Sequence, residues 1–423
     1  MLDIKFIREN KDLVIDAARK KKIRVDIEGL IRLDEKRRAL LLSLEPKRRD
    51  QAEFGRRIAL VRDTTERQQL IEEMRLVKED IQKEEEELKN VMQEWRKLML
   101  LVPNIPDITV PEGEKDEDSV EVKKWGTLPT FPFTPKSHTD LMTNLNLVDF
   151  ERGVKVSGFR GYFLKGDSVR LSFALWRYTL DRLIAAGFTP LMVPSLVTRE
   201  SAMGTGYLPQ GEEDLYRTQD DTFLAGTGEV ASMAYHMDDT FSLEALPKKY
   251  VAFSPCFRRE AGSYGRDTKG LMRVHEFFKL EQVIFCQASH EESVRFHDEL
   301  NRTMEMIIED LEIPYRTIVN HAGDLGLGQV KKYDIELWVP SEKTYREISS
   351  ASYFHDFQTR RLNVRYRDTS GKLSFAHSLN CTAMPTPRIL IALLENHQQE
   401  DGSIKLPQAL IPYFGESVIQ KNA

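Results

Sequence analysis

The 423-residue sequence has few cysteines and lacks long apolar runs. Its three cysteines, Cys256, Cys286 and Cys381, are widely spaced and odd in number, which argues against both a disulfide framework and a structural zinc site. No stretch of about 18 apolar residues suggests a membrane-spanning helix, and charges interrupt every apolar run near the N-terminus. We therefore expect a soluble protein of the cytoplasm, with reduced cysteines and no zinc.

The chain also lacks an excess of basic residues. Lysine and arginine number 61, aspartate and glutamate number 67, and the formal net charge is −6. This balance argues against nucleic-acid binding by overall basicity but leaves room for a local basic face. The sequence has no GxxxxGK[ST] loop for nucleotide phosphates, and its nine histidines show no metal-ligand spacing. Any nucleotide chemistry must therefore depend on other residues.

Composition divides the chain into residues 1–102, a linker over residues 103–118, and residues 119–423. Prolines end the first part, and the rest of the linker is acidic and polar. Near the N-terminus the apolar spacing predicts one short amphipathic helix. Its apolar residues are Ile4, Ile7, Val14, Ile15 and Ala18.

The segment from Leu30 to Val102 has the spacing of heptad seams. Two such seams, joined at Arg62-Asp63-Thr64-Thr65, predict an antiparallel coiled-coil hairpin over about residues 30–100. At 1.5 Å per residue the arm would extend roughly 50 Å, and Pro46 is expected to kink its first helix. The seam of the second helix consists of Leu70, Met74, Val77, Ile81, Leu88, Val91, Trp95 and Leu98, and only Glu84 interrupts it.

The two helices of this hairpin differ in charge. Residues 31–62 carry ten basic and five acidic side chains, whereas residues 66–100 carry seven basic and ten acidic ones. One interpretation is ion pairing between the helices. The alternative is a phosphate-binding edge on the first helix, with Lys47, Arg48, Arg49, Arg56, Arg57 and Arg62 as candidates.

Residues 119–423 mix β-rich segments with helical ones. Turns separate the strands more often than regular helices do, which predicts an α+β domain around an antiparallel sheet. The predicted strands include Tyr250–Ser254, Glu281–Phe285, Asp334–Val339 and Leu362–Arg367, and helices are predicted over residues 290–311 and 386–397.

The most informative segment runs from Phe257 to Phe277 and is predicted to form a strand, a polar loop and a second strand. It begins Phe257-Arg258-Arg259-Glu260-Ala261-Gly262 and continues from Arg266 through Arg273-Val274-His275-Glu276-Phe277. An arginine can bind a phosphate through two hydrogen bonds and keeps its charge. An aromatic side chain on the returning strand suits a purine ring. An exposed charged hairpin is the alternative interpretation of the segment.

This segment resembles motif 2 of the class II aminoacyl-tRNA synthetases, in the form of the seryl-tRNA synthetase family. The resemblance covers essentially the whole chain and implies a class II antiparallel β-sheet catalytic domain flanked by helices, preceded by the tRNA-binding hairpin. Leu180–Pro194 resembles motif 1, the dimer-forming helix and strand, and Asn380 to Asn396 resembles motif 3. Thr227-Gly228-Glu229 resembles the serine-binding loop. The runs Tyr345–Ser350 and Asp356–Arg361 are also typical of the family.

The resemblance implies a ligase that activates serine with ATP and releases pyrophosphate. The seryl group of the adenylate would then pass to the 3′ end of tRNA(Ser), and also of tRNA(Sec), with AMP as product. The resemblance further implies a homodimer, Mg²⁺ as cofactor, and an arm that reaches the long variable region of the tRNA across the dimer.

The residue roles are likewise those that the resemblance implies. Catalytic roles fall to Arg258, Arg388 and Glu347, with Arg258 between the serine carboxylate and the α-phosphate. Phe277 and Arg388 would cover the two faces of the adenine ring. The implied ATP-binding residues are Arg258, Arg259, Glu260, Val274, Phe277, Glu347, Ile348, Ser349, Ser350 and Arg388. The implied serine-binding residues are Thr227, Gly228, Glu229, Arg258, Glu281, Asn380 and Thr382. Glu347 and Ser350 would hold Mg²⁺ on the ATP phosphates.

The sequence departs from the usual family pattern at a few positions. Gly228 stands where alanine is usual, Cys381 follows Asn380 in place of glycine, and Pro385 and Pro387 precede Arg388. Two other functions stay open from the residues alone. One is a ligase that activates an amino acid for a carrier protein, and the other is a tRNA-binding paralogue without catalysis.

Overall fold

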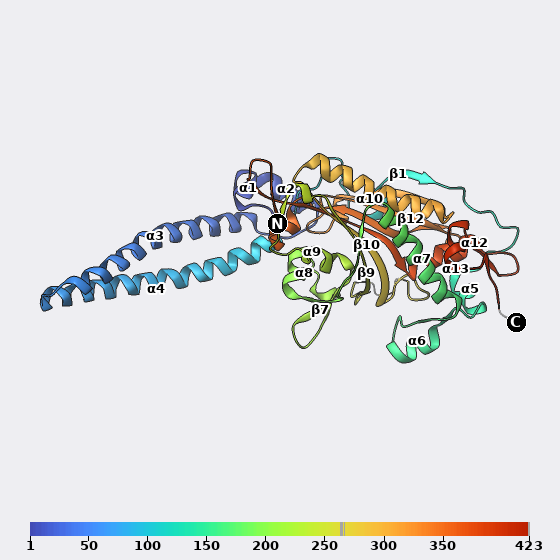
Figure 1. Ribbon diagram of the computed structural model, residues 1–423, viewed down its shortest axis with the longest axis horizontal. Helices are drawn as coiled ribbons and strands as arrows, with labels where there is room; N and C mark the ends of the chain where they lie inside the picture. Colours follow the sequence, from blue (N-terminus) through green and yellow to red (C-terminus); the bar gives the residue numbers. More distant parts are fainter. Residues whose placement is uncertain (263–264, 266, 422–423) are drawn as a thin grey trace. The chain divides into compact units, whose positions relative to one another are not determined.

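The computed structural model of the chain describes residues 1–262, 265 and 267–421 (Figure 1). It contains two compact units, Met1–Pro103 and Asn104–Ala423. No helix in the described part of the chain combines the length and the apolar character needed to cross a membrane.

The first unit consists entirely of helices. They are α1 (Ile4–Glu9), α2 (Lys11–Lys20), α3 (Ile27–Leu60) and α4 (Thr64–Leu101). The prediction of one helix near the N-terminus is wrong, because Asn10 adopts φ −126° and ψ 41° and separates α1 from α2.

The predicted coiled-coil hairpin is confirmed, because α3 and α4 pack along each other. The Asp63 side chain accepts hydrogen bonds from the backbone N–H groups of Thr65 and Glu66 and so begins α4. Helix α3 continues through Pro46. The predicted seam residues of α4 are buried or half-buried, and most of their neighbours are exposed. Glu84, which interrupts the seam, accepts hydrogen bonds from Ser43 and Lys47 of α3.

The basic side chains of α3 fall into two groups. Lys47 forms ion pairs with Asp80 and Glu84, Arg48 with Glu85, and Arg49 with Glu45. In the described part of the chain, no ion pair or side-chain hydrogen bond engages the other three candidates, which are exposed near the tip of the hairpin: Arg56, Arg57 and Arg62. Ion pairing between the helices therefore accounts for Lys47 and Arg48, whereas Arg49 pairs within α3.

An eight-stranded sheet forms the centre of the second unit. Its strands pair antiparallel except for β4 and β9, which are parallel. The strand order is β1 (Val120–Trp125), β11 (Tyr315–Val319), β12 (Lys331–Val339), β13 (Thr344–Tyr353), β16 (His377–Thr386), β10 (Glu276–Cys286), β9 (Lys248–Phe257) and β4 (Thr189–Met192). The predicted antiparallel α+β class is thus confirmed.

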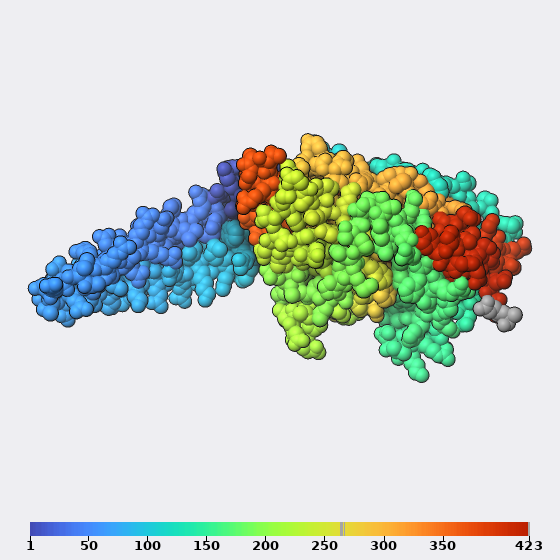
Figure 2. Space-filling model, in the orientation of Figure 1, coloured from blue at the N-terminus to red at the C-terminus, as the bar shows by residue number. Residues whose placement is uncertain are grey.

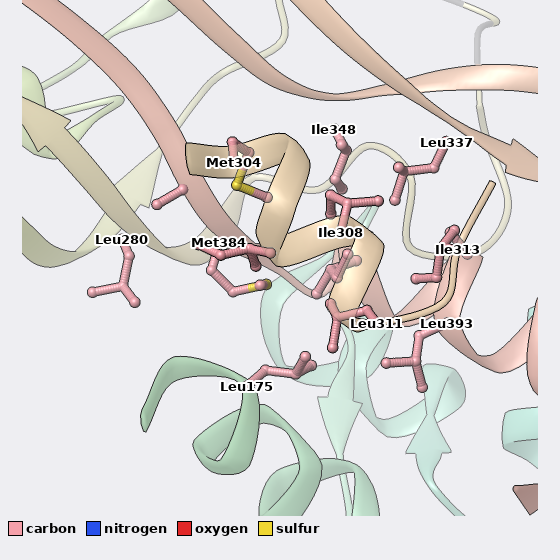
Figure 3. Packing of buried hydrophobic residues seen from close by; sticks show 14 of the residues in the cluster. Leu175, Leu280, Met304, Ile308, Leu311, Ile313, Leu337, Ile348, Met384 and Leu393 are labelled. Carbon is pink, nitrogen blue, oxygen red and sulfur yellow. The ribbon is translucent and has the colours of Figure 1, made fainter. Parts of the chain in front are cut away.

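Three helices cover one face of this sheet and form the main core with it: α7 (Asp167–Ala185), α10 (His290–Asp310) and α12 (Arg388–His397). In Figure 3, Met304 and Ile308 of α10 lie near Leu337, Ile348 and Met384 of the strands. These side chains are at most 3% exposed, so their burial supplies much of the hydrophobic stabilisation of the unit.

The opposite face of the sheet is only partly covered. Three short helices pack at one end of it: α8 (Arg199–Thr205), α9 (Gly228–Ala234) and α11 (Phe357–Leu362). Because side chains alternate along a strand, Val283 and Phe285 of β10 meet these helices and Phe277, Lys279 and Glu281 share the same face. One face of β10 therefore contacts the helices at one end of the strand and lines the candidate site at the other.

The remaining elements are short. The helices are α5 (His138–Asn144), α6 (Phe150–Ser157) and α13 (Ile411–Phe414). The strands are β2 (Val148–Asp149), β3 (Phe163–Leu164), β5 (Leu196–Thr198), β6 (Tyr216–Arg217), β7 (Thr222–Leu224), β8 (Thr240–Ser242), β14 (Arg365–Arg367), β15 (Leu373–Phe375), β17 (Ile404–Lys405) and β18 (Val418–Ile419).

Most of the predicted strands and helices of this unit are present. The predicted strand Leu362–Arg367 is wrong at its start, because Leu362 ends α11 and Asn363 adopts φ 55° in the left-handed region. The last predicted helix begins at Arg388, two residues late, because Pro387 is its N-cap.

The segment predicted as a linker belongs, from Asn104 onward, to the second unit and makes specific contacts within it. The side-chain amide of Asn104 donates to the carbonyl oxygens of Phe354, at 2.7 Å, and Gly328, at 3.1 Å. Asp107 accepts a hydrogen bond from the hydroxyl of Tyr353 at 2.7 Å. Residues 104–107 are therefore anchored rather than a free tether.

Candidate active site

A polar cavity lies where β10, β13 and β16 meet the loop after β9 and the start of α12. It brings together eight residues predicted from the sequence: Arg258, Glu260, Val274, Phe277, Glu347, Ile348, Thr382 and Arg388. Leu271, Met272, Arg273, Lys279, Pro385, Thr386 and Pro387 complete the lining.

Arg258 follows β9 directly and is held against β10. Its backbone N–H donates to the carbonyl of His275, and its Nε donates to the carbonyl of Gly226 at 3.2 Å. The guanidinium carbon lies 5.2 Å from the ring centroid of Phe277. A fixed cation and an aromatic face therefore share one wall of the cavity, an arrangement suited to a phosphate attached to a ring.

Arg388 begins α12 and reaches the cavity from another side. Its Nε donates to the carbonyl of Met272 at 3.2 Å, and its Nη1 donates to the carbonyl of Glu347 at 3.1 Å. Burial lowers the pKa of Arg388, and the nearby Glu347 carboxylate opposes this shift. Arg388 thus lines the same cavity as Arg258 even though Pro385 and Pro387 precede it.

The chain leaves β9 through an unusual conformation. Glu260 adopts φ 54°, in the left-handed region that side chains other than glycine rarely occupy. Its carboxylate accepts a hydrogen bond from Arg273 at 2.7 Å. Arg259 does not line the cavity, because its side chain is exposed and donates to the carbonyl of Glu213. Arg266 lies outside the described residues.

A bulge in β13 places Glu347 and Ser350 on the same face of the sheet. Ser350 pairs with Asp334 of β12, whereas Glu347 pairs with Glu336 after a shift of register. Without the bulge, side chains three residues apart would point to opposite faces. Ser349 is buried and donates to the carbonyl of Thr382, so its side chain lies outside the cavity.

A second polar cluster adjoins the cavity and contains Thr227 and Glu229. Thr227 is the N-cap of α9, and its hydroxyl donates to Glu281 at 3.2 Å. Both oxygens of the buried Glu229 carboxylate are engaged, one by Tyr207 at 2.9 Å and the other by Gln358 at 2.7 Å. These hydrogen bonds fix the positions of the carboxylates of Glu229 and Glu281, which can accept hydrogen bonds from a ligand.

The Glu229 carboxyl has an unusual protonation equilibrium. Burial and the nearby Glu281 carboxylate raise its pKa from 4.5 to about 7. Hydrogen bonds from Gln358 and Tyr207 and the charge of Lys279 oppose this shift. A cation bound beside Glu229 would favour its ionised form.

Glu281 lies in the same cluster, two residues beyond Lys279 on β10. Lys279 forms an ion pair with Glu281, and the hydroxyl of Thr382 donates to Glu281 at 3.5 Å. Asn380 lies two residues before Thr382 on β16, on the same face of the strand, and is 9% exposed. Thr227, Glu229, Glu281 and Thr382, which were predicted for the serine pocket, thus come together.

Gly228 permits close packing of α9 against β9. A Cβ atom at this position would lie 3.1 Å from Oγ of Ser254 and 3.3 Å from Cβ of Ala252. A second departure, Cys381, is fully buried in the main core beneath Ser349. Neither departure removes a polar group from the cluster.

Several residues in this region were not predicted from the sequence, and four of them carry charged or polar groups of the site. Lys279 and Arg273 line the cavity, and Tyr207 and Gln358 hold Glu229. Alternation along a strand could have identified Lys279, because it lies midway between Phe277 and Glu281. Tyr207 and Gln358 belong to segments whose proximity to Glu229 has no sequence signal.

Comparison with known proteins identifies the family of the chain. Residues 1–106 match the family described as the seryl-tRNA synthetase N-terminal domain, and residues 213–397 match the tRNA synthetase class II core domain (G, H, P, S and T). The chain is 44% identical over 418 residues to a serine–tRNA ligase from Deinococcus radiodurans, with 98% of each chain covered. The chain belongs to the seryl-tRNA synthetase family.

Solved structures of seryl-tRNA synthetases have the same fold. The seryl-tRNA synthetase from Pyrococcus horikoshii, complexed with ATP, matches with a TM-score of 0.91 and 36% identity over 100% of both chains. The cytoplasmic serine–tRNA ligase from Naegleria fowleri, in complex with AMP, matches with a TM-score of 0.87 and 32% identity, covering 100% of this chain and 99% of the other. The predicted family and class II fold are confirmed.

Proposed function

We propose that this chain activates serine with ATP, forming seryl-adenylate and pyrophosphate, and then transfers the seryl group to the 3′ end of tRNA(Ser). The observation that carries this proposal is the continuity of two sites. The cavity with Arg258, Phe277 and Arg388 adjoins the acceptor cluster with Glu229 and Glu281, and Lys279 belongs to both. A nucleotide and a small amino acid bound there would meet near Arg258.

In the first step the serine carboxylate attacks the α-phosphorus of ATP, and pyrophosphate leaves. No protein nucleophile is needed, so catalysis depends on positioning and on neutralising the charge that develops on the phosphate. Arg258 would bridge the carboxylate and the α-phosphate, while Phe277 and Arg388 would enclose the adenine. In the second step the terminal ribose hydroxyl of the tRNA attacks the carbonyl carbon, and AMP leaves.

The serine side chain and ammonium would be held by the acceptor cluster. Thr227 and Glu229 would bind the ammonium, and Glu281 and Thr382 would bind the hydroxyl. A buried acceptor left without its partner costs about 1–3 kcal/mol. Alanine and glycine lack the hydroxyl, so the pocket would disfavour them on this ground.

The donor atoms of Glu347 and Ser350 fit a Mg²⁺ ion bound through the ATP phosphates. Both are hard oxygens on one face of the sheet, and Mg²⁺ in such sites usually takes one or two protein carboxylates together with phosphates and water. Asp334, beside Ser350, has a buried carboxylate oxygen without a hydrogen-bond partner in the described part of the chain. When bound, the ion would stabilise negative charge on the phosphates.

The hairpin supplies a surface for the tRNA. The exposed Arg56, Arg57 and Arg62 near its tip are suited to phosphate contacts because no carboxylate within the described residues neutralises them. Contacts of this kind favour recognition of the shape of a tRNA over its base sequence. We extend the proposal to tRNA(Sec) and to a cytoplasmic location.

An apolar face of the second unit fits a second copy of the chain. A cavity of about 810 Å³ lies between the segment 157–176 and the region of Tyr216 and Leu224, and Figure 2 shows this hollow. Around it Phe173 is 63% exposed and Phe159 is 58% exposed, and Met192 on the edge strand β4 is 85% exposed. Exposed apolar residues of this size indicate an interface, and a homodimer of about twice 49.0 kDa is expected by light scattering.

The test is a charging assay with the purified chain, serine, ATP, MgCl₂ and tRNA. The proposal expects serine esterified to tRNA(Ser) and release of AMP and pyrophosphate. Activation of serine without transfer to tRNA would instead indicate a carrier-type ligase. Binding of tRNA without activation would indicate a non-catalytic paralogue.

A further inference from the structure

Lys279 is a buried cation in the middle of the candidate site. It lies on β10 between Phe277, which lines the nucleotide cavity, and Glu281, which belongs to the acceptor cluster. Successive side chains on one face of a strand are roughly 7 Å apart. The residue is only 4% exposed. A lysine at such a position is rare unless it is paired.

All the donors of the Lys279 ammonium have acceptors. Its Nζ donates to Oγ1 of Thr227 at 2.8 Å and to Oγ1 of Thr382 at 3.3 Å, and it forms an ion pair with Glu281. An ammonium has three N–H groups. Because these three partners use all of them, Lys279 belongs to the wall of the pocket and has no donor left for a phosphate.

The contacts also fix the charge of the pocket. Glu229 and Glu281 are both buried carboxylates, at 3% and 2% exposure. When Glu229 is ionised, as it would be beside a bound ammonium, it sums with Glu281 and Lys279 to one negative charge. This charge matches the single ammonium of a neutral amino acid such as serine. Without Lys279 the site would hold two uncompensated carboxylates, and such groups take up protons or bind additional cations.

Building on the proposed function, we propose that Lys279 is a specificity-determining residue of the serine pocket. Its ammonium holds Glu281 as an ionised acceptor for the substrate hydroxyl and limits the pocket to substrates with one positive charge. The substrate class excluded in this way consists of amino acids with a second ammonium on the side chain, such as 2,3-diaminopropionate, the amino analogue of serine.

The test compares the intact protein with Lys279→Met, Glu281→Gln and the double variant in amino-acid-dependent ATP–pyrophosphate exchange. Lys279→Met should lower kcat/KM for serine by about 10²- to 10³-fold, because one partner of a buried pair is removed. The loss should lie mainly in the KM for serine, with the KM for ATP within about threefold of the unaltered protein. The same variant should gain exchange with 2,3-diaminopropionate.

The double variant separates charge compensation from mere packing. Removing the Glu281 charge in the Lys279→Met background should restore serine exchange at least tenfold relative to Lys279→Met. If Lys279→Met does not fold, recovery of folding in the double variant, seen by thermal denaturation, supports the same compensation.

Several results would overturn the inference. These are serine exchange by Lys279→Met within threefold of the unaltered protein, a loss confined to kcat, and a double variant no better than Lys279→Met in exchange or folding. Absence of serine-dependent exchange in the unaltered protein would instead refute the proposed function.

Discussion

Charged residues are abundant both in the hairpin and in the serine pocket, but they are used differently. Lys47 pairs with Glu84 between α3 and α4, and the two side chains are 29% and 21% exposed. Lys279 pairs with Glu281 on β10, and these side chains are 5% and 2% exposed. Water can replace a partner in the hairpin but not in the pocket. We therefore expect substitutions in the pocket to affect chemistry strongly and substitutions of paired hairpin residues to affect little.

The largest effect is expected at Arg258. Arg258→Ala should lower the rate of serine-dependent ATP–pyrophosphate exchange by about 10²- to 10³-fold, as expected when one group that stabilises developing charge is removed. Arg295 of α10 is a matched control, because it too lies over a phenylalanine ring, Phe296, but is paired with Glu292 at the surface. Exchange by Arg258→Ala within tenfold of the Arg295→Ala control would contradict the assignment.

The next effect concerns the arginines of the hairpin that have no ion-pair partner among the residues that the structure describes. Changing Arg56, Arg57 and Arg62 together to glutamine should raise the KM for tRNA while leaving ATP–pyrophosphate exchange unaltered. The slope of log affinity against log salt should fall by about 0.7–0.9 for each phosphate that the variant no longer neutralises.

The matched control for the hairpin is a triple glutamine variant of arginines that already have carboxylate partners: Arg48, Arg49 and Arg75. This variant should bind tRNA almost as well as the unaltered chain. Equal losses of affinity in both triple variants would show that total charge, rather than unpaired charge, attracts the tRNA.

A smaller effect is expected when the pH changes, and it concerns the affinity for serine. The pKa of Glu229 is about 7, and the ionised form is needed to bind an ammonium. Serine affinity should therefore weaken about tenfold between pH 8 and pH 6. Besides Lys279 and Glu281, the titratable group that contacts Glu229 is Tyr207, whose pKa burial raises well above its usual value. Serine titrations should show this dependence in the unaltered protein and a flat profile in Glu229→Gln.

The same shift in pKa has a consequence for stability. A carboxyl group whose pKa is higher in the folded protein than in the unfolded chain binds its proton more tightly when folded. The contribution of Glu229 to the free energy of unfolding should therefore decrease as the pH rises from 4.5 to about 7. Glu229→Gln should not show this pH-dependent decrease in the free energy of unfolding, which thermal denaturation at several pH values would measure.

The smallest effect is expected for Lys47. Lys47→Met removes ion pairs to Asp80 and Glu84 at the surface of the hairpin, so the melting temperature should hardly change. Asp34 provides the contrast, because its side chain is fully buried between Arg8 and Arg37. Asp34→Ala should destabilise the first unit by about 1–3 kcal/mol. A larger destabilisation by Lys47→Met than by Asp34→Ala would reverse the expected order.

The fold was predictable where a period in the sequence sets the structure. The heptad spacing of Leu70, Ile81 and Val91 predicts the seam of α4, and all three are buried. The spacing of apolar residues predicts short elements less well. Leu362–Arg367 has the composition of a strand, yet tertiary packing places Leu362 at the end of a helix and leaves only Arg365–Arg367 as a strand.

The site was predictable where residues share one segment. Arg258, Glu260 and Phe277 occur in one motif, and all three line the cavity. Gln358 could not be connected with Glu229 from the sequence, because 129 residues separate them and only the fold brings the amide within 2.7 Å of the carboxylate. The role of Lys279 was not predictable for another reason, since it depends on which groups meet its ammonium.

The central claim is that the second unit activates serine. It is tested most directly by ATP–pyrophosphate exchange without tRNA, comparing serine with threonine, alanine, glycine and cysteine. We predict exchange driven by serine and little exchange with the other four. Exchange driven chiefly by another of these amino acids, or by none of them, would contradict the claim.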